Sequence, residues 1–160
     1  MPPIGFEHHD HAACIHDGAA AAAAYCDANG LQFTPQRRRV LEILLEGHRA
    51  MGAYEILDRL REEGLGAQPP VAYRALDFLT GHGFAHRIER LNAFIACSHM
   101  GEIHAPAFLI CRRCSVVAEA SVDPRHGELG AALREADFTL ERAVIEVEGL
   151  CPACRTDDAA

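Results

Sequence analysis

The sequence predicts an α+β fold in two parts, an N-terminal winged helix-turn-helix and a smaller C-terminal α/β domain. Three observations support this prediction. Apolar residues recur at helical spacing as far as residue 83, two short strand-like segments follow, and two C-x-x-C pairs flank the mixed region after residue 106. The chain has 160 residues, 49% of them hydrophobic, which suits one large domain or two small ones with a buried core.

Four helices are expected in the N-terminal part. They lie at about 19–28, from Thr34-Pro35 onward, at about 53–63, and from Pro69-Pro70 to Gly83. Asn29-Gly30 is a typical helix C-cap. Thr34 and Pro35 are typical of an N-cap and a first helical position. In the fourth helix an apolar stripe faces the core, so Tyr73, Arg74 and Asp77 point away from it.

A hairpin follows the fourth helix, with strands at about 85–90 and 93–97 and a turn at Leu91-Asn92. Helices followed by such a hairpin make a winged helix-turn-helix, whose last helix normally enters the DNA major groove. The polar segment 98–105 contains Gly101 and is expected to be a hinge. The predicted organisation is a flexible histidine-rich tail at 1–17, a winged-helix domain at 18–97, the hinge at 98–105, a C-terminal domain at 106–156 and a tail at 157–160.

The C-terminal domain is expected to mix strands and one helix. Strands are predicted near 107–110, 116–120 and 143–148, with a helix near 124–136. The first C-x-x-C pair lies between two consecutive strands of this unit.

Charge is unevenly distributed along the chain. The formal net charge is −8 at pH 7, which by itself argues against a nucleic-acid partner. Residues 26–90, however, carry nine arginines against nine acids, whereas the segments on either side are acidic. The run Arg37-Arg38-Arg39 lies in this middle segment, so a local basic face is compatible with the acidic total.

Targeting signals are missing from the sequence. No apolar run approaches the roughly 18 residues of a membrane helix, and residues 1–25 contain no Lys or Arg to begin a signal peptide. We therefore expect a soluble cytoplasmic protein, in which cysteine pairs favour metal over disulfide.

The two C-x-x-C pairs are Cys111–Cys114 and Cys151–Cys154. Each pair presents two thiolates from one tight turn, and two such turns make the tetrahedral cage that Zn²⁺ prefers in structural sites. Two disulfides or a thiol redox pair are the alternatives. The metal interpretation implies that zinc closes a whole subdomain, because the two pairs are 36 residues apart.

A second group of ligands is predicted around the hairpin. If Leu91-Asn92 is the turn, His86 lies opposite Cys97, close enough to share a metal. His104 and Glu119 can complete the set from the C-terminal domain. The alternative is that His86 is a surface residue, Cys97 a small buried apolar residue and Glu119 a solvated one.

Several segments together resemble the Fur family of metal-dependent repressors, and most closely its zinc-uptake-regulator (Zur) branch. The resemblance covers roughly residues 20–155. It is carried by the segments Leu31-Gln32-Phe33-Thr34-Pro35-Gln36-Arg37, Ala53-Tyr54-Glu55-Ile56-Leu57, Pro69 to Leu79, and His104 to Cys111, and by the second C-x-x-C pair.

The resemblance implies a cytoplasmic homodimer that binds AT-rich palindromic operator DNA when loaded with metal. It makes the C-terminal domain a dimerisation domain. It implies about two zinc ions per subunit. The structural ligands would be Cys111, Cys114, Cys151 and Cys154, and the sensing ligands His86, Cys97, His104 and Glu119. Iron and peroxide sensors of this fold carry a His-His-Asp-His block that this chain lacks before Cys111, and the soft thiolate of Cys97 favours zinc.

Contacts to DNA are assigned by residue type. Arg74 is expected to read a guanine and Tyr73 to touch a thymine methyl or a phosphate. Arg37, Arg38 and Tyr54 are expected to anchor phosphates. A solvated face paired with acids is the alternative for the arginine run.

Three further hypotheses stay open at this stage. The tail residues His8, His9, His11 and Cys14 could hold an auxiliary metal. Asp58 and Arg61 could pair within their helix or across two dimers on one operator. A zinc hydrolase using His86, His104 and Glu119 is the main competing class, but four candidate ligands would leave no open position for a catalytic water.

Overall fold

The computed structural model describes residues 5–6, 10–66, 68–102 and 104–157, which divide into two compact units. The N-terminal unit is Glu7–Gly101, and the C-terminal unit combines Met1–Phe6 with Glu102–Ala160. The chain therefore leaves the N-terminal unit inside the segment expected to be a hinge. Among the described residues, no helix has the length and apolar character needed to cross a membrane.

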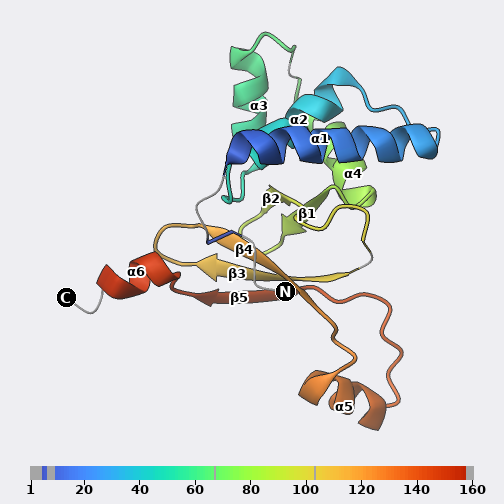
Figure 1. Cartoon of the computed structure of the whole chain (residues 1–160), viewed down its shortest axis with the longest axis vertical. Helices are drawn as coiled ribbons and strands as arrows, with labels where there is room; N and C mark the ends of the chain where they lie inside the picture. The colour runs from blue at the N-terminus through green and yellow to red at the C-terminus, as the bar shows by residue number, and fades with distance from the viewer. Residues whose placement is uncertain (1–4, 7–9, 67, 103, 158–160) are drawn as a thin grey trace. The chain divides into compact units, whose positions relative to one another are not determined.

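The N-terminal unit contains four helices and a two-stranded antiparallel sheet (Figure 1). The elements are α1 (His11–Ala28), α2 (Pro35–Leu45), α3 (Ala53–Glu62), α4 (Pro69–Gly81), β1 (Ala85–Ile88) and β2 (Ala93–Ala96). This order of three helices after α1 followed by a hairpin is the predicted winged helix-turn-helix.

Helix α1 begins earlier than the sequence predicted. It starts at His11 rather than near residue 19, because the Asp10 side chain caps it by accepting the Ala12 N–H at 2.9 Å. His11 and Cys14 therefore lie on a helix and not in a flexible tail. His8 and His9 lie outside the described residues.

Local capping explains where the next helices begin. The Thr34 hydroxyl accepts the Arg37 N–H at 3.3 Å, as the sequence predicted for α2. At α3 the Glu55 carboxylate accepts the Gly52 N–H at 3.0 Å, which satisfies a backbone donor before the first turn. Pro69 occupies the first turn of α4, where its missing N–H costs nothing.

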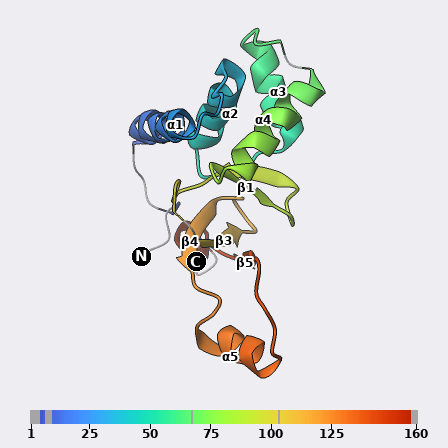
Figure 2. The same cartoon turned by 90° about the vertical axis from the view of Figure 1, so that its right-hand side faces the viewer.

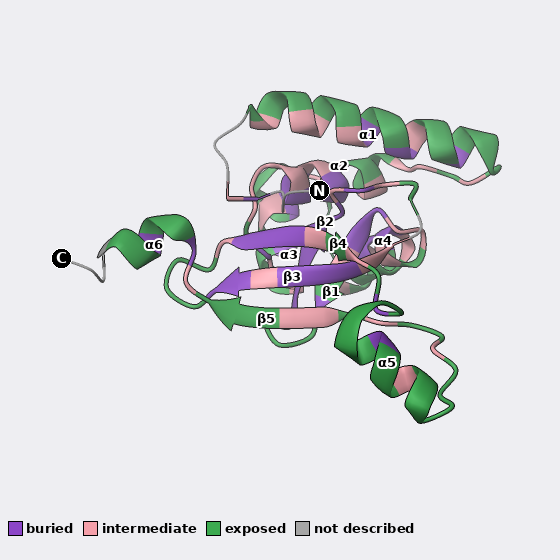
Figure 3. Ribbon diagram, turned by 60° about the horizontal axis from the view of Figure 1, so that its bottom comes forward, coloured by how far each residue is buried: buried purple, intermediate pink, exposed green. Residues whose placement is uncertain are grey.

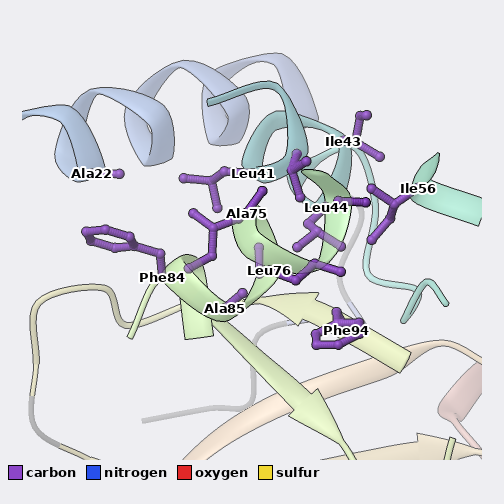
Figure 4. Close-up of a cluster of buried hydrophobic side chains, with 14 of the residues drawn as sticks. Ala22, Leu41, Ile43, Leu44, Ile56, Ala75, Leu76, Phe84, Ala85 and Phe94 are labelled. Atoms are coloured by element: carbon purple, nitrogen blue, oxygen red, sulfur yellow. The ribbon is translucent and has the colours of Figure 1, made fainter. Parts of the chain in front are cut away.

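The core of the N-terminal unit lies between the helices and the hairpin (Figure 4). Leu41 and Leu44 of α2, Ile56 of α3, Leu76 of α4 and Phe84 are all at most 1% exposed. Helix α2 packs against both α1 and α4 (Figure 2). Burying each such side chain contributes about 1.5–3 kcal/mol, so this core fixes the orientation of α4.

The hairpin turn is longer than the sequence predicted. Four residues from Glu89 to Asn92 form it, and the Asn92 N–H donates to the Glu89 carbonyl at 3.1 Å. Asn92 adopts a φ of 46°, which asparagine tolerates better than most residues. The predicted two-residue turn at Leu91-Asn92 was therefore wrong.

The longer turn changes the strand register by two residues. His86 pairs with Ile95 instead of Cys97. Cys97 follows the end of β2, and its N–H donates to the Phe84 carbonyl at 2.9 Å. Since side chains alternate with a period of two, this shift leaves His86 and Cys97 on the same face as diagonal neighbours.

The C-terminal unit is built on a three-stranded sheet in the order β4-β3-β5 (Figure 3). Its elements are β3 (Ala105–Cys111), β4 (Val117–Val122), α5 (Gly127–Glu135), β5 (Ile145–Gly149) and α6 (Pro152–Asp157). Strand β3 pairs antiparallel with β4 and parallel with β5. The sequence did not predict α6, whose first residue lies inside the second C-x-x-C pair.

Apolar side chains remain exposed on the C-terminal unit. Strand β3 is largely buried, whereas the end of β5 and most of α5 are exposed (Figure 3). The exposed large apolar residues here are Leu129, Phe138, Val144 and Val147, at 38–62%. An apolar surface of this kind is typical of an interface.

A network of charges joins α2 to α3. The Arg39 guanidinium lies 2.6 Å from the Glu63 carboxylate and 3.0 Å from that of Glu46, which in turn is 2.7 Å from Arg59. The hydrogen bonds from Arg39 lower the pKa of Glu63 below its ordinary value of 4.5. Arg39 thus belongs to a structural network, the alternative considered for the arginine run.

Replacing Glu63 with Gln should lower the free energy of unfolding by about 0.5–1 kcal/mol at pH 7. Glu63 has a lowered pKa in the folded protein, so its stabilisation is present above pH 4.5 and is lost as the pH falls through the folded-state pKa. Urea unfolding of both proteins should therefore show a larger difference in the free energy of unfolding at pH 7 than near pH 3.

The matched control is Glu62→Gln, which removes the same charge from the neighbouring position of α3. It should leave stability nearly unchanged, because no ion pair of Glu62 is among the contacts of the described residues. Equal destabilisation by both variants would show that helix charge, not the network, is responsible.

Candidate metal centres and nucleic-acid interface

The parallel pairing of β3 and β5 brings the two C-x-x-C pairs together. Cys111 at the end of β3 is the register partner of Gly149, and Cys151 follows two residues later. The Arg112 N–H donates to the Gly149 carbonyl at 2.9 Å, which extends this pairing into the first cysteine turn. A tight turn then returns the chain to β4, with the Ser115 N–H on the Cys111 carbonyl at 2.9 Å.

The four cysteine sulfurs have the spacing of a metal cage. All four lie within 4.8 Å of one another, and those of Cys114 and Cys151 are 3.7 Å apart. Four thiolates at about 2.3 Å from a tetrahedral Zn²⁺ would be about 3.8 Å apart, whereas a disulfide requires about 2.05 Å. The cluster therefore fits a zinc ion, and none of the seven cysteines is in a disulfide.

The pKa values of the cysteine thiols also indicate that the cluster needs a cation. The N–H groups of Cys114 and Cys151 donate to the Cys111 sulfur and lower the pKa of that thiol to about 6. Burial, followed by hydrogen bonds from the neighbouring thiols, raises the pKa of Cys154 to about 12. A fourth thiolate is thus unfavourable without compensation, and a divalent metal ion supplies it.

Two of the predicted sensing ligands lie at the base of the hairpin in the N-terminal unit. Nitrogen of His86 and sulfur of Cys97 lie within 4.8 Å of each other. Cys97 is 2% exposed, and its sulfur accepts the His99 N–H at 3.3 Å. Sequence reasoning missed His99, which is 7% exposed; its position two residues after Cys97 was the available signal.

The other two predicted ligands lie together in the C-terminal unit. The Nε2 atom of His104 is 2.9 Å from Oε1 of Glu119, and their side chains are 6% and 1% exposed. The Nδ1 atom of His104 is 2.9 Å from the Glu102 carbonyl, which can only accept, so Nδ1 carries a hydrogen. A bare Nε2 lone pair facing a carboxylate would be repulsive. Either a proton or a metal ion must therefore lie between the two side chains.

Three of the residues predicted to contact DNA are exposed on α3 and α4. On α4, Tyr73 is 44% exposed and Arg74 is also exposed, while Ala72 and Ala75 face the core. On α3, Tyr54 is 66% exposed. Because α3 and α4 bury their apolar faces in the core, these three side chains point toward solvent.

The arginine run divides into different environments. The Arg37 guanidinium lies 3.7 Å from the centre of the Phe78 ring and donates to the Gln32 carbonyl. The Arg38 side chain is 46% exposed and lies 4.0 Å from the Glu42 carboxylate. Arg37 is held in place by α4, whereas Arg38 remains available to a phosphate.

Two of the four residues proposed for an auxiliary metal site, His11 and Cys14, lie among the described residues. His11 and Cys14 lie on α1, and the His11 ring is 5.1 Å from that of His48. Within the described ranges, neither His11 nor Cys14 belongs to a group of three or more candidate metal ligands.

Asp58 and Arg61 pair within α3. Their charged atoms are 3.2 Å apart and the side chains are 67% and 52% exposed, so the pair contributes little to stability.

Known proteins resemble this chain over most of its length. The model of the ferric uptake regulator family matches residues 28–148. The zinc uptake regulation protein of Escherichia coli (strain K12) is 38% identical over 136 residues, covering 84% of this chain and 80% of that protein. A solved structure of a zinc uptake regulator complexed with zinc and DNA has a TM-score of 0.83 at 35% identity, covering 91% of this chain and 98% of that one. Holo XcZur gives a TM-score of 0.77 at 37% identity, with coverages of 88% and 98%.

Replacing Cys151 with Ser should remove one tightly held zinc ion per chain, because three thiolates and a hydroxyl are a much weaker set than four thiolates. Loss of that ion should also lower the melting temperature. Zinc content after gel filtration with a mild chelator, measured by atomic absorption, tests the expectation.

The control variant is Cys26→Ser, which alters a buried cysteine of the N-terminal unit. It should destabilise the protein without changing the zinc content. An unchanged zinc content in Cys151→Ser would contradict the assignment of the cluster.

Proposed function

Because this chain belongs to the ferric uptake regulator family, we propose that it is a zinc-responsive repressor of zinc uptake and homeostasis genes. It acts in the cytoplasm as a homodimer on palindromic operator DNA. The ligand types carry this proposal. A thiolate beside imidazole and carboxylate is a set that favours zinc over iron or manganese, and the similar zinc uptake regulation protein of E. coli supports the same ion.

The proposed sensing site consists of His86, Cys97, His104 and Glu119. Two neutral imidazoles, one thiolate and one carboxylate balance the charge of Zn²⁺. Within each unit, two of these residues already lie close together, as His86 with Cys97 and His104 with Glu119. When bound, one Zn²⁺ ion would be coordinated by all four side chains. With the cysteine cluster, this gives two zinc ions per subunit.

The four side chains connect two units between which the chain otherwise passes twice, at Phe6–Glu7 and at Gly101–Glu102. His86 and Cys97 are fixed to the hairpin of the DNA-binding unit, whereas His104 and Glu119 are fixed to the sheet of the dimerisation unit. Ligation by all four restricts the spacing of the two DNA-binding units in a dimer. Half-sites one helical turn or more apart then select this restricted state. Zinc and DNA must strengthen each other's binding by the same factor.

Reading of the operator is assigned to α4 and its neighbours. Arg74 donates two hydrogen bonds to a guanine, the commonest specific pairing, and Tyr73 contacts a thymine methyl or a phosphate. Tyr54, Arg37 and Arg38 hold phosphates and so set affinity rather than sequence preference. Stacking of Arg37 on Phe78 supports this role, because it fixes the guanidinium beside α4.

The exposed apolar surface of the C-terminal unit supports homodimerisation. Phe138 at 62% and Val147 at 48% exposure are unusually accessible for residues of their size. A second copy would cover them, since two identical apolar surfaces are self-complementary around a two-fold axis. Two dimers on one operator would additionally require exposed charges such as Asp58 and Arg61 to pair between dimers.

An enzymatic role is the less favoured alternative. A hydrolytic zinc site keeps one position for water, whereas four protein ligands are proposed here. An iron or peroxide sensor would require harder, oxygen-rich ligands in place of Cys97.

Replacing Cys97 with Ser should abolish zinc-dependent operator binding at limiting free zinc, because the sensing set loses its thiolate. A gel-shift titration against buffered free zinc should show the midpoint rising at least tenfold. Total zinc per chain should fall from two to one after mild chelation.

Cys14→Ser is the matched control, since it removes a thiol from α1 and should leave the titration unchanged. Operator affinity that does not depend on zinc in the unaltered protein would refute the proposed function.

Replacing Arg74 with Ala should cost about 1–3 kcal/mol of operator binding and reduce the preference for operator over random DNA. Arg38→Ala should weaken binding to both DNAs equally and reduce the salt dependence of binding. Fluorescence anisotropy with both duplexes at two salt concentrations separates these outcomes. Uniform weakening by Arg74→Ala would make that residue a phosphate contact.

A further inference from the structure

Two residues from the N-terminus lie in the C-terminal unit. Gly5 is buried, and a Cβ atom at this position would lie 2.6 Å from the Val117 carbonyl oxygen and 2.7 Å from the Ala118 Cα. Gly5 also adopts a φ of +139°, a conformation that favours glycine. The backbone at Gly5 therefore approaches β4 more closely than any other residue type would permit.

The next residue covers the cysteine cluster. Cys111, Cys151 and Cys154 are 1–8% exposed, and in the described part of the chain the partly buried apolar residues packed against them are Phe6 and Leu150. Leu150 directly precedes Cys151, so its position near the cluster follows from its place in the sequence. Phe6 is distant in sequence, and the close approach of Gly5 to β4 places it next to the cluster.

An apolar side chain over a metal-thiolate cluster affects the rate at which the metal leaves. Water and chelators must reach the sulfurs before the metal can be exchanged, and the hydrophobic surroundings of a site control this access. Cys114 is the exposed member of the cluster. Dissociation can start at Cys114, but its completion requires access to three sulfurs beneath Phe6 and Leu150.

We propose that Gly5 and Phe6 form a strap that retains the structural zinc kinetically, with Gly5 as the anchor on β4 and Phe6 as the cover. This inference rests on the structural zinc site of the proposed function. Phe6 is the last residue of this part of the C-terminal unit, and the N-terminal unit begins at the next residue of the chain.

The test is the rate of zinc release from the cysteine cluster of the full-length protein, followed with an excess of a chromogenic chelator. A Cys97→Ser background restricts the measurement to the cluster. Phe6→Ala should release zinc about fivefold faster, the effect of losing part of the transfer free energy of a half-buried phenyl ring. Phe6→Leu should stay close to the unaltered rate, because it keeps an apolar cover.

Leu91→Ala is the control for Phe6→Ala, since it truncates an apolar residue that is 39% exposed on the hairpin turn. Gly5→Ala should also accelerate release, because the added Cβ displaces the anchor. Its control is Gly64→Ala, which also places a side chain at a positive φ, of +70°, but has no atom within 4 Å of the added Cβ. Both controls should release zinc at the unaltered rate.

Release at the unaltered rate from both Phe6→Ala and Gly5→Ala would overturn the strap while leaving the structural zinc site intact. A protein whose cysteine cluster retains no zinc would overturn the strap and the structural site together. Circular dichroism of each variant ensures that faster release is not caused by unfolding.

Discussion

The parallel pairing of β3 with β5 is the constraint on which the C-terminal unit depends. Parallel strands end at the same edge of a sheet, so the pairing of Cys111 with Gly149 delivers Cys151 to the first cysteine turn. Without this register, two C-x-x-C turns far apart in sequence would have no reason to meet. A metal ion bound there would in turn stabilise the register, because four thiolates cannot be held at this spacing without a cation.

The same sheet also fixes half of the proposed sensing site. Strand β4 pairs antiparallel with β3, so Glu119 on this edge strand lies opposite Phe108 and is 1% exposed. A buried carboxylate needs a partner, and His104 meets this need at 2.9 Å. The structural cluster and the sensing carboxylate therefore share β3 as a common support. The proposed function depends on this rigidity, because zinc bound to ligands on a rigid sheet can restrict the position of the ligands on the hairpin.

Much of this arrangement was predictable from the sequence because its signals are local. Helix periodicity, the Thr34 cap and the C-x-x-C spacing each depend on a few neighbouring residues, and the predicted winged helix and cysteine cage follow from them. The early start of α1 was missed because histidines and Asp10 suggested a tail, although Asp10 caps the helix. The hairpin register was missed because alternation alone does not specify turn length. The packing of Phe6 on the cluster depends on tertiary contacts that no periodic pattern reveals.

The hairpin register keeps the two proposed zinc ligands of the hairpin away from its turn. His86 and Cys97 lie at the base of the hairpin, and the paired residues Ile88 and Ala93 stand between them and the turn. Insertions or substitutions in the turn from Glu89 to Asn92 leave the ligand positions unchanged, since Cys97 is fixed through the Phe84 carbonyl. The tip of the wing can consequently vary in sequence without moving the two proposed zinc ligands at its base.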